Sequence, residues 1–193
     1  MHPDEIKLAA DKFREEHWGT EIPVDIEKII DFKLGIDVVP ISGLRSQCDT
    51  DALIASNWQQ IYVDNGHYTD DRYQSRIRFS LAHEIGHFVL HKALWEKLGI
   101  KSISDFYKVY DVFPEGDYSI IESQANKFAG HLLVPRSVLA IHRDNLLKSK
   151  PTLTSGIEKK SLIMYISIPL AKIFDVSEKT LEISLNDLDW DLS

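Results

Sequence analysis

The N-terminal third of the chain changes from a helical to an extended pattern of apolar residues. Between Ile6 and Trp18 apolar residues recur at near-helical spacing among charges, which predicts an amphipathic helix ending near Gly19. Asp25 is a favourable N-cap and Gly35 a favourable terminator, so a second helix is expected between them. A small three-stranded sheet is predicted from three β-like runs, at Ile36 to Val39, Ala52 to Ala55 and Gln60 to Val63. The segment between the first two runs, Gly43 to Asp51, is expected to be a polar connection.

Helical periodicity dominates the remainder of the chain. It runs from Asp70 or Asp71 to about His91, with apolar residues along one side, and again from Ile120 to Val134. Residues 92–119 are expected to be irregular, with one short helix around 104–110. A polar linker at residues 148–160 then precedes a final helical segment.

These patterns predict an α+β domain at residues 1–147 and, at residues 148–193, a linker with a C-terminal helical unit packed on it. Residues 170–181 have the pattern of a helix-turn-helix, with Ser177 as the cap of its second helix. DNA binding by this unit is disfavoured, because Lys179 is the only basic residue after Phe174. The acidic residues there are Asp175, Glu178, Glu182, Asp187, Asp189 and Asp191. Packing or partner docking is the preferred interpretation of the unit.

Composition narrows the functional class. The chain has 193 residues, with 22 Lys and Arg against 30 Asp and Glu, giving a net charge of −8. This balance argues against a general nucleic-acid-binding surface. Cys48 is the single cysteine, so neither an internal disulfide nor a cysteine-based zinc site is possible. No membrane span or export signal is evident, and we expect a cytoplasmic protein.

A metal-binding motif lies within the predicted helix at residues 70–91. His83-Glu84-Ile85-Gly86-His87 has the HExxH form. On a helix, His83 and His87 lie on one face about 6 Å apart, so both imidazoles can bind one zinc ion. Glu84 falls beside the open position of that ion, where it can act as the general base that activates water. This arrangement suits peptide hydrolysis.

A third ligand must come from another part of the chain. His91 stands about 12 Å along the helix from His83 and about 80° around it, so it cannot join the same ion on a straight helix. We expect it to lie behind the ligands or to be exposed. Glu122, on the next strong helix, is the better candidate. Asn126, one turn later, could hydrogen-bond the free ring nitrogen of a ligating histidine. A metzincin would have a glycine and a third histidine after the motif, but Leu90 and Ala93 stand at those positions in this chain. The metzincin class is therefore excluded.

Taken together, these residues resemble the ImmA/IrrE family of metallopeptidases, over most of the chain. The resemblance is carried by the segments Arg78 to His91, Glu122 to Ala129, Leu132 to Pro135, Ile22 to Glu27 with Leu34 to Ile36, and Ile61 to Asp64. It implies a zincin-like fold, with zinc on His83, His87 and Glu122 and with Glu84 as general base. Gln124 stands where many members have a second glutamate, which leaves Glu122 as the acidic ligand. Manganese is also possible, because the same donors accept it.

The resemblance also implies a substrate. Known members cleave Xre-type helix-turn-helix repressors or antitoxins and thereby derepress phage, mobile-element or stress genes. We expect the substrate to add as a strand along Gln60 to Asp64, through Ile61, Tyr62 and Val63, if that segment is an exposed sheet edge rather than an interior strand. Two other functions stay open at this point. The chain could grip an Xre-type protein without cutting it, as in a toxin-antitoxin pair, or the zinc could be purely structural, which Glu84 and the missing fourth protein ligand argue against.

Overall fold

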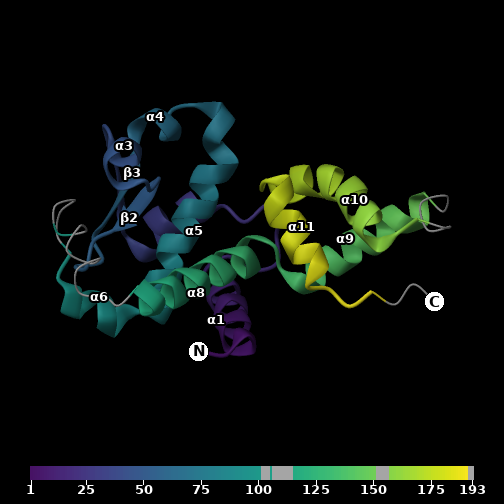
Figure 1. Ribbon diagram of the computed structural model, residues 1–193, viewed down its shortest axis with the longest axis horizontal. Coiled ribbons are helices and arrows are strands. Elements are labelled where there is room, and N and C mark those ends of the chain that lie inside the picture. The colour runs from purple at the N-terminus through teal and green to yellow at the C-terminus, as the bar shows by residue number, and fades with distance from the viewer. Residues whose placement is uncertain (101–104, 106–114, 151–156, 191–193) are drawn as a thin grey trace.

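The sheet lies at one end of the molecule and the C-terminal helices at the other (Figure 1). The computed structural model describes residues 1–100, 105, 115–150 and 157–190. Two helices, α5 (Gln74–Leu90) and α8 (Glu115–Leu133), run through the middle and pack against each other. Helix α1 (Pro3–His17) packs on α8, and the sheet packs on α5. The predicted helical segment from Asp70 or Asp71 is confirmed, beginning with a short 3₁₀ turn, η2 (Asp71–Tyr73).

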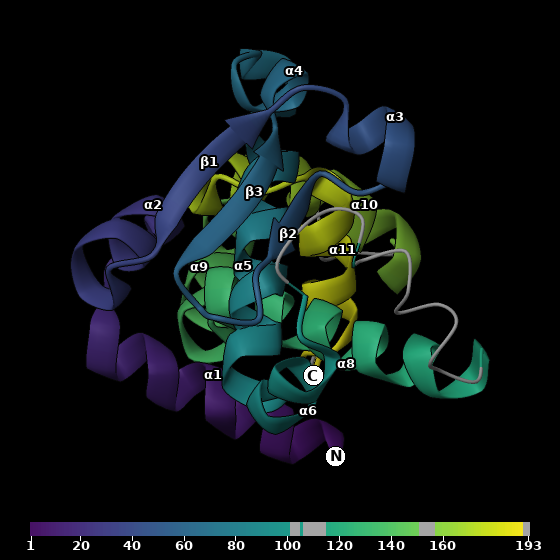
Figure 2. The ribbon, with the colours of Figure 1, turned by 90° about the vertical axis from the view of Figure 1, so that its left-hand side faces the viewer.

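Within the described residues the sheet has three strands, as predicted. They are β1 (Asp37–Ile41), β2 (Ala52–Ile54) and β3 (Gln60–Asp64). Their order is β1-β3-β2, with β1 parallel and β2 antiparallel to β3. Figure 2 shows the three strands side by side in front of α5.

The prediction that Gln60 to Asp64 forms an exposed edge is wrong. The tight turn after β2 brings β3 back antiparallel to it, and β1 pairs in parallel with the other side of β3. Both hydrogen-bonding sides of β3 are therefore used. Ile61 and Val63 are 0% exposed, and Tyr62 is half-buried. A substrate strand cannot add along Ile61, Tyr62 and Val63 in this arrangement.

The N-terminal helices follow the predicted boundaries. Helix α1 ends at His17, and Asp25 caps α2 (Ile26–Lys28) by accepting the Lys28 N–H at 3.0 Å. The chain continues as a π-helical turn, η1 (Ile29–Leu34), which Gly35 ends in the left-handed conformation at φ 63°. Glycine adopts that conformation without steric cost, which explains why the helix stops there.

Three short helices were not predicted. Helix α3 (Leu44–Cys48) lies in the expected polar connection, α4 (Asn65–Tyr68) follows β3, and α6 (Lys92–Leu98) follows α5. Asp64 holds two of them in place, because its carboxylate accepts the Arg45 N–H of α3 and the His67 N–H of α4. The contact with Arg45 joins residues 19 positions apart and does not register in local periodicity, whereas the cap on α4 is local. The short helix predicted around residues 104–110 lies outside the described residues.

The described residues of the C-terminal part include the helices α9 (Arg136–Ser149), α10 (Lys159–Phe174) and α11 (Glu178–Asn186). Helix α9 was not predicted. Ser177 caps α11 through the Thr180 N–H at 3.1 Å, and Leu181 and Leu185 are fully buried. The predicted helix pair around Ser177 is therefore confirmed, whereas the domain boundary at residue 148 stays a prediction. No helix among the described residues combines the length and the apolar character needed to cross a bilayer.

Candidate metal centre

Three potential metal ligands converge between α5 and α8. His83 and His87 lie one turn apart on α5, with their Nε2 atoms 2.9 Å from each other. Glu122 reaches them from α8, with one carboxylate oxygen 3.2 Å from His83 Nε2 and the other 3.3 Å from His87 Nε2. The three donor atoms all lie within 4.8 Å of one another. The structure thus brings together the three residues predicted as metal ligands.

A close approach of the two helices makes this convergence possible. Gly86 faces Ala125 of α8, and a Cβ at position 86 would lie 3.1 Å from both the Cα and the carbonyl oxygen of Ala125. This distance is tighter than ordinary van der Waals contact. Glycine therefore lets the backbones approach beside His87, and Glu122, three residues before Ala125, comes within reach of both histidines.

Hydrogen bonds on the far side of the imidazoles set their orientation. His83 Nδ1 lies 2.9 Å from Asn126 Oδ1, as predicted from the helix spacing. His87 Nδ1 lies 3.0 Å from His91 Nδ1, and His91 Nε2 lies 3.0 Å from Gln124 Oε1. Both amide oxygens are acceptors, so each must receive a proton from its histidine partner.

The direction of these bonds fixes the tautomers. With the His91 proton on Nε2, toward Gln124, its Nδ1 can only accept, and the proton between the two rings belongs to His87 Nδ1. His83 likewise carries its proton on Nδ1, toward Asn126. The Nε2 lone pairs of His83 and His87 therefore face each other and the Glu122 carboxylate. Three electron-rich atoms at this separation suit a cation, and the two imidazoles and one carboxylate are the donor set of a catalytic zinc site.

Electrostatics favour the deprotonated state at His87 and Glu122. The pKa of His83 is raised instead: burial lowers it, but the hydrogen bond to Glu122 and the charges of Glu84 and Glu122 outweigh burial. Burial lowers the pKa of His87 to about 4, because the cationic form would lose its hydration. For Glu122, burial alone would raise the pKa. Hydrogen bonds to His83 and His87 outweigh this effect, so the net pKa of Glu122 lies well below the usual range. At neutral pH His87 is therefore neutral and Glu122 is charged, the states that metal binding requires.

Glu84 lies in a small pocket with two of the three ligands, His83 and Glu122. His83, Glu84, Glu122 and Asn126 all line this cavity of about 180 Å³. Glu84 is 5% exposed, and its Oε2 accepts the Ile54 N–H of β2 at 2.8 Å. Burial raises the pKa of its carboxyl group to about 7. A carboxyl group with such a pKa can both take up and release a proton near neutral pH.

The structure resolves one open expectation about the site and adds one residue that the sequence did not indicate. His91 is 8% exposed and contacts His87 directly, so the expectation that it lies behind the ligands or is exposed resolves to the first. Helix α3 contributes Arg45 to the pocket, although its segment has the pattern of a loop. The spacing of His87 and His91, four residues apart on a helix, was the available signal for the contact between them. We find no local signal for the position of Arg45 in the pocket.

We expect His91→Phe to lower zinc affinity about 10–100-fold, because His87 Nδ1–H loses its acceptor and the ring loses its fixed tautomer. The affinity is measured by competition with a chromophoric chelator at pH 7. His142→Phe is the matched control, since His142 is half-buried on α9 against Phe174, and should bind zinc as the wild type does. Equal affinities in all three proteins would exclude a role for the His87–His91 contact.

Comparison with known proteins places this site in a family. The family model described as the IrrE N-terminal-like domain, Peptidase M78, matches residues 67–186, which include His83, Glu84, His87 and Glu122. A solved structure of a Mycobacterium tuberculosis transcriptional regulator has a similar fold, with a TM-score of 0.56 and 17% sequence identity. The similarity covers 92% of this chain but 45% of that one, so this chain spans less than half the length of its neighbour. No curated protein sequence matches. The family model covers more than half of the chain, and the chain therefore belongs to the Peptidase M78 family of IrrE N-terminal-like domains.

Proposed function

We propose that this protein is a zinc-dependent endopeptidase. The observation that carries the proposal is the convergence of His83, His87 and Glu122, with Glu84 lining the same small pocket as His83 and Glu122. Membership of a peptidase family supports it. A bound zinc ion would polarise the scissile carbonyl and lower the pKa of the attacking water, and manganese could fill the same role.

The protein's own contribution centres on Glu84. The Ile54 N–H engages Oε2 and holds the carboxyl group in position, and we assign the moving proton to Oε1. In this assignment Oε1 takes a proton from water as the water attacks the peptide carbon, and then gives it to the departing amine nitrogen. The C–N bond breaks, and Glu84 returns to its initial charge. A pKa near 7 suits both transfers.

For the substrate, we propose an Xre-type helix-turn-helix repressor or antitoxin, which cleavage would inactivate to derepress its genes. The resemblance to repressor-cleaving peptidases supports this choice. The solved structure of similar fold is named a transcriptional regulator, which agrees with a role in transcriptional control. Such a function would place the protein in the cytoplasm with its partner.

The test is intact-mass analysis of a candidate Xre-type repressor from the same genome, purified after co-expression with this chain. We expect two fragments whose masses add up to the mass of the repressor plus one water. Their formation should require zinc or manganese. The bond cleaved follows from the masses. A repressor that stays intact and co-purifies with the chain would contradict cleavage and favour the non-cleaving partner instead.

A further inference from the structure

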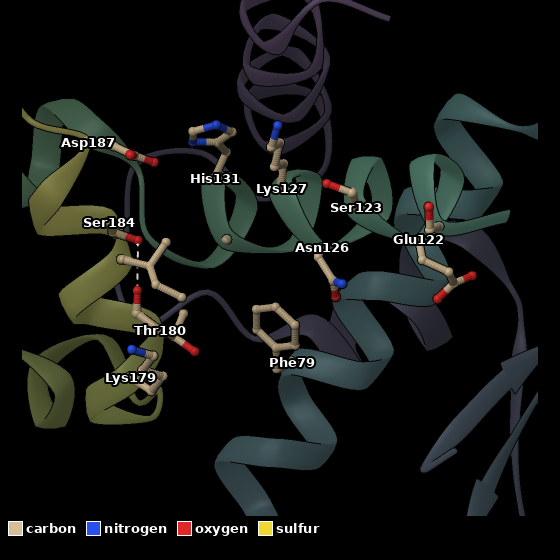
Figure 3. Close-up of a pocket in the computed structure, with 13 residues that line it drawn as sticks. Phe79, Glu122, Ser123, Asn126, Lys127, His131, Lys179, Thr180, Ser184 and Asp187 are labelled. Atoms are coloured by element: carbon tan, nitrogen blue, oxygen red, sulfur yellow. Dashed lines mark hydrogen bonds between the residues drawn. The ribbon is translucent and has the colours of Figure 1, made fainter. Parts of the chain in front are cut away.

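A larger cleft opens beside the metal centre, between α8 and α11. Its volume is about 760 Å³, within the range of pockets that enclose a ligand. Phe79, Glu122 and Asn126 line both this cleft and the small pocket that holds His83 and Glu84. Figure 3 shows Phe79 between the α11 side chains and Asn126, with Glu122 at the metal end. The two cavities are thus adjacent and share a wall at the candidate metal ligands.

The cleft has an apolar interior and charged side chains of both signs, because Glu122 and Asp187 line it together with two lysines. Phe79 and Ile183 are the large apolar side chains among its lining residues, and Ile183 is 54% exposed. Lys127 of α8 and Lys179 of α11 line the cleft from opposite sides, as Figure 3 shows. An occupant with an apolar side chain would cover Phe79 and Ile183.

Gly130 keeps the α8 side of the cleft open. It lies inside α8, where glycine lowers helix stability relative to alanine, and a Cβ there would meet no atom within 4 Å. Packing therefore does not require glycine at this position, in contrast to Gly86, where a Cβ would press on Ala125. The space that a side chain at position 130 would fill is space within the cleft.

The α11 side is held in a fixed position. Arg78 of α5 donates to the Asp175 carbonyl at 3.1 Å, and its guanidinium lies 3.2 Å from the Asp175 carboxylate, at the turn before α11. Leu181 and Leu185 are buried on the other side of α11. Thr180, Ile183 and Ser184 consequently face α8 across the cleft. The helix that would read DNA in a helix-turn-helix instead forms a wall beside the metal centre.

We propose that this cleft binds the polypeptide substrate on one side of the scissile bond. It takes an extended segment with a large apolar side chain close to that bond. The proposal rests on the proposed peptidase function and deepens it. Continuity with the metal ligands and the apolar lining carry it, and α11 becomes a determinant of substrate choice.

Peptidyl hydroxamates provide the test, because the hydroxamate anchors on the metal and the peptide arm samples the cleft. Arms of three residues are attached on either side of the hydroxamate, with glycine, leucine or phenylalanine nearest to it. Dissociation constants are measured by calorimetry on the zinc-loaded full chain. We expect leucine or phenylalanine arms on one side to bind at least tenfold more tightly than the glycine arm.

The variants locate that preference in the cleft. Gly130→Leu, which fills the cleft, and Ile183→Asp, which makes it polar, should reduce the preference to less than threefold while acetohydroxamate binds as before. Melting temperatures report folding, and Gly130→Leu should melt at or above the wild-type temperature. Ile141→Asp is the matched control, since Ile141 is 59% exposed on α9. It should keep the full preference.

Two outcomes overturn the proposal. One is a set of peptidyl hydroxamates that bind no more tightly than acetohydroxamate, and the other is a preference that survives in both Gly130→Leu and Ile183→Asp. Neither depends on catalysis. A protein that shows the preference and cleaves no repressor contradicts the peptidase function alone, whereas one that cleaves without discriminating the arms contradicts the cleft proposal alone.

Discussion

Replacing Glu84 by glutamine is expected to lower the rate of peptide cleavage at least about 100-fold, because the amide cannot take a proton from water. Glutamine has the same size and can still accept the Ile54 N–H through its oxygen, so the pocket should keep its shape. His83, His87 and Glu122 are unchanged. Zinc should therefore bind to the variant about as tightly as to the wild type.

The measurement pairs cleavage with metal content in the same preparations. Rates are followed by mass spectrometry on the repressor fragments, and zinc is quantified per chain. Glu16→Gln, an exposed glutamate on α1, serves as the control and should match the wild type in both. Undiminished cleavage by the Glu84→Gln protein would exclude Glu84 as the general base.

Gly86→Leu should have the second large effect, on stability and on metal binding together. A side chain at position 86 presses on the Ala125 backbone, and overpacking of this kind costs about 1–3 kcal/mol of unfolding free energy. Relief requires α8 to move away from α5. Glu122 would then leave the two histidines, so we expect zinc affinity to fall at least about tenfold.

Gly130→Leu is the matched control for this prediction, because it places the same side chain at another interior position of the paired helices. Position 130 faces open space, so that variant should retain wild-type stability and zinc affinity. Urea unfolding and chelator competition measure the two quantities. Similar stability and zinc affinity in the two variants would contradict the close packing of α5 on α8 as the basis of the site.

The ligand set could be predicted from the sequence because it depends on spacing within two helices. On any helix of ordinary geometry, His83 and His87 lie on the same face. Glu122 and Asn126 likewise lie on one face of the second helix. The Asn126–His83 contact follows once the two faces meet. The spacing did not explain why the two helix faces meet. The reason is the close approach of α5 and α8 at Gly86.

The order of the strands could not be predicted from local sequence patterns. The residues of β3 read as a strand, and its turn to β2 was visible, but which strand lies in the centre depends on the parallel pairing with β1. The alternative of an interior strand was therefore the correct one. The helices α3 and α6 were missed for a related reason. Asp64 anchors the first, and the buried Trp95 of the second stacks on His87 with ring centroids 4.1 Å apart.

The function of the C-terminal helix pair also depends on placement. Its pattern indicated a helix-turn-helix, and its acidic charge disfavoured DNA. The structure turns the side of α11 that carries Thr180, Ile183 and Ser184 toward α8, next to the candidate metal ligands. The sequence alone could indicate that these α11 side chains are exposed. Their position opposite Gly130 could be seen only in the folded structure.

Zinc titration of the full chain by native mass spectrometry tests the central claim most directly. The account predicts one zinc ion per chain in the wild type, and an affinity at least about 100-fold lower in Glu122→Ala. Glu158→Ala, an exposed glutamate before α10, should bind zinc as the wild type does. Wild-type affinity in Glu122→Ala, or a wild-type chain that holds no zinc, would contradict a metal centre built on His83, His87 and Glu122.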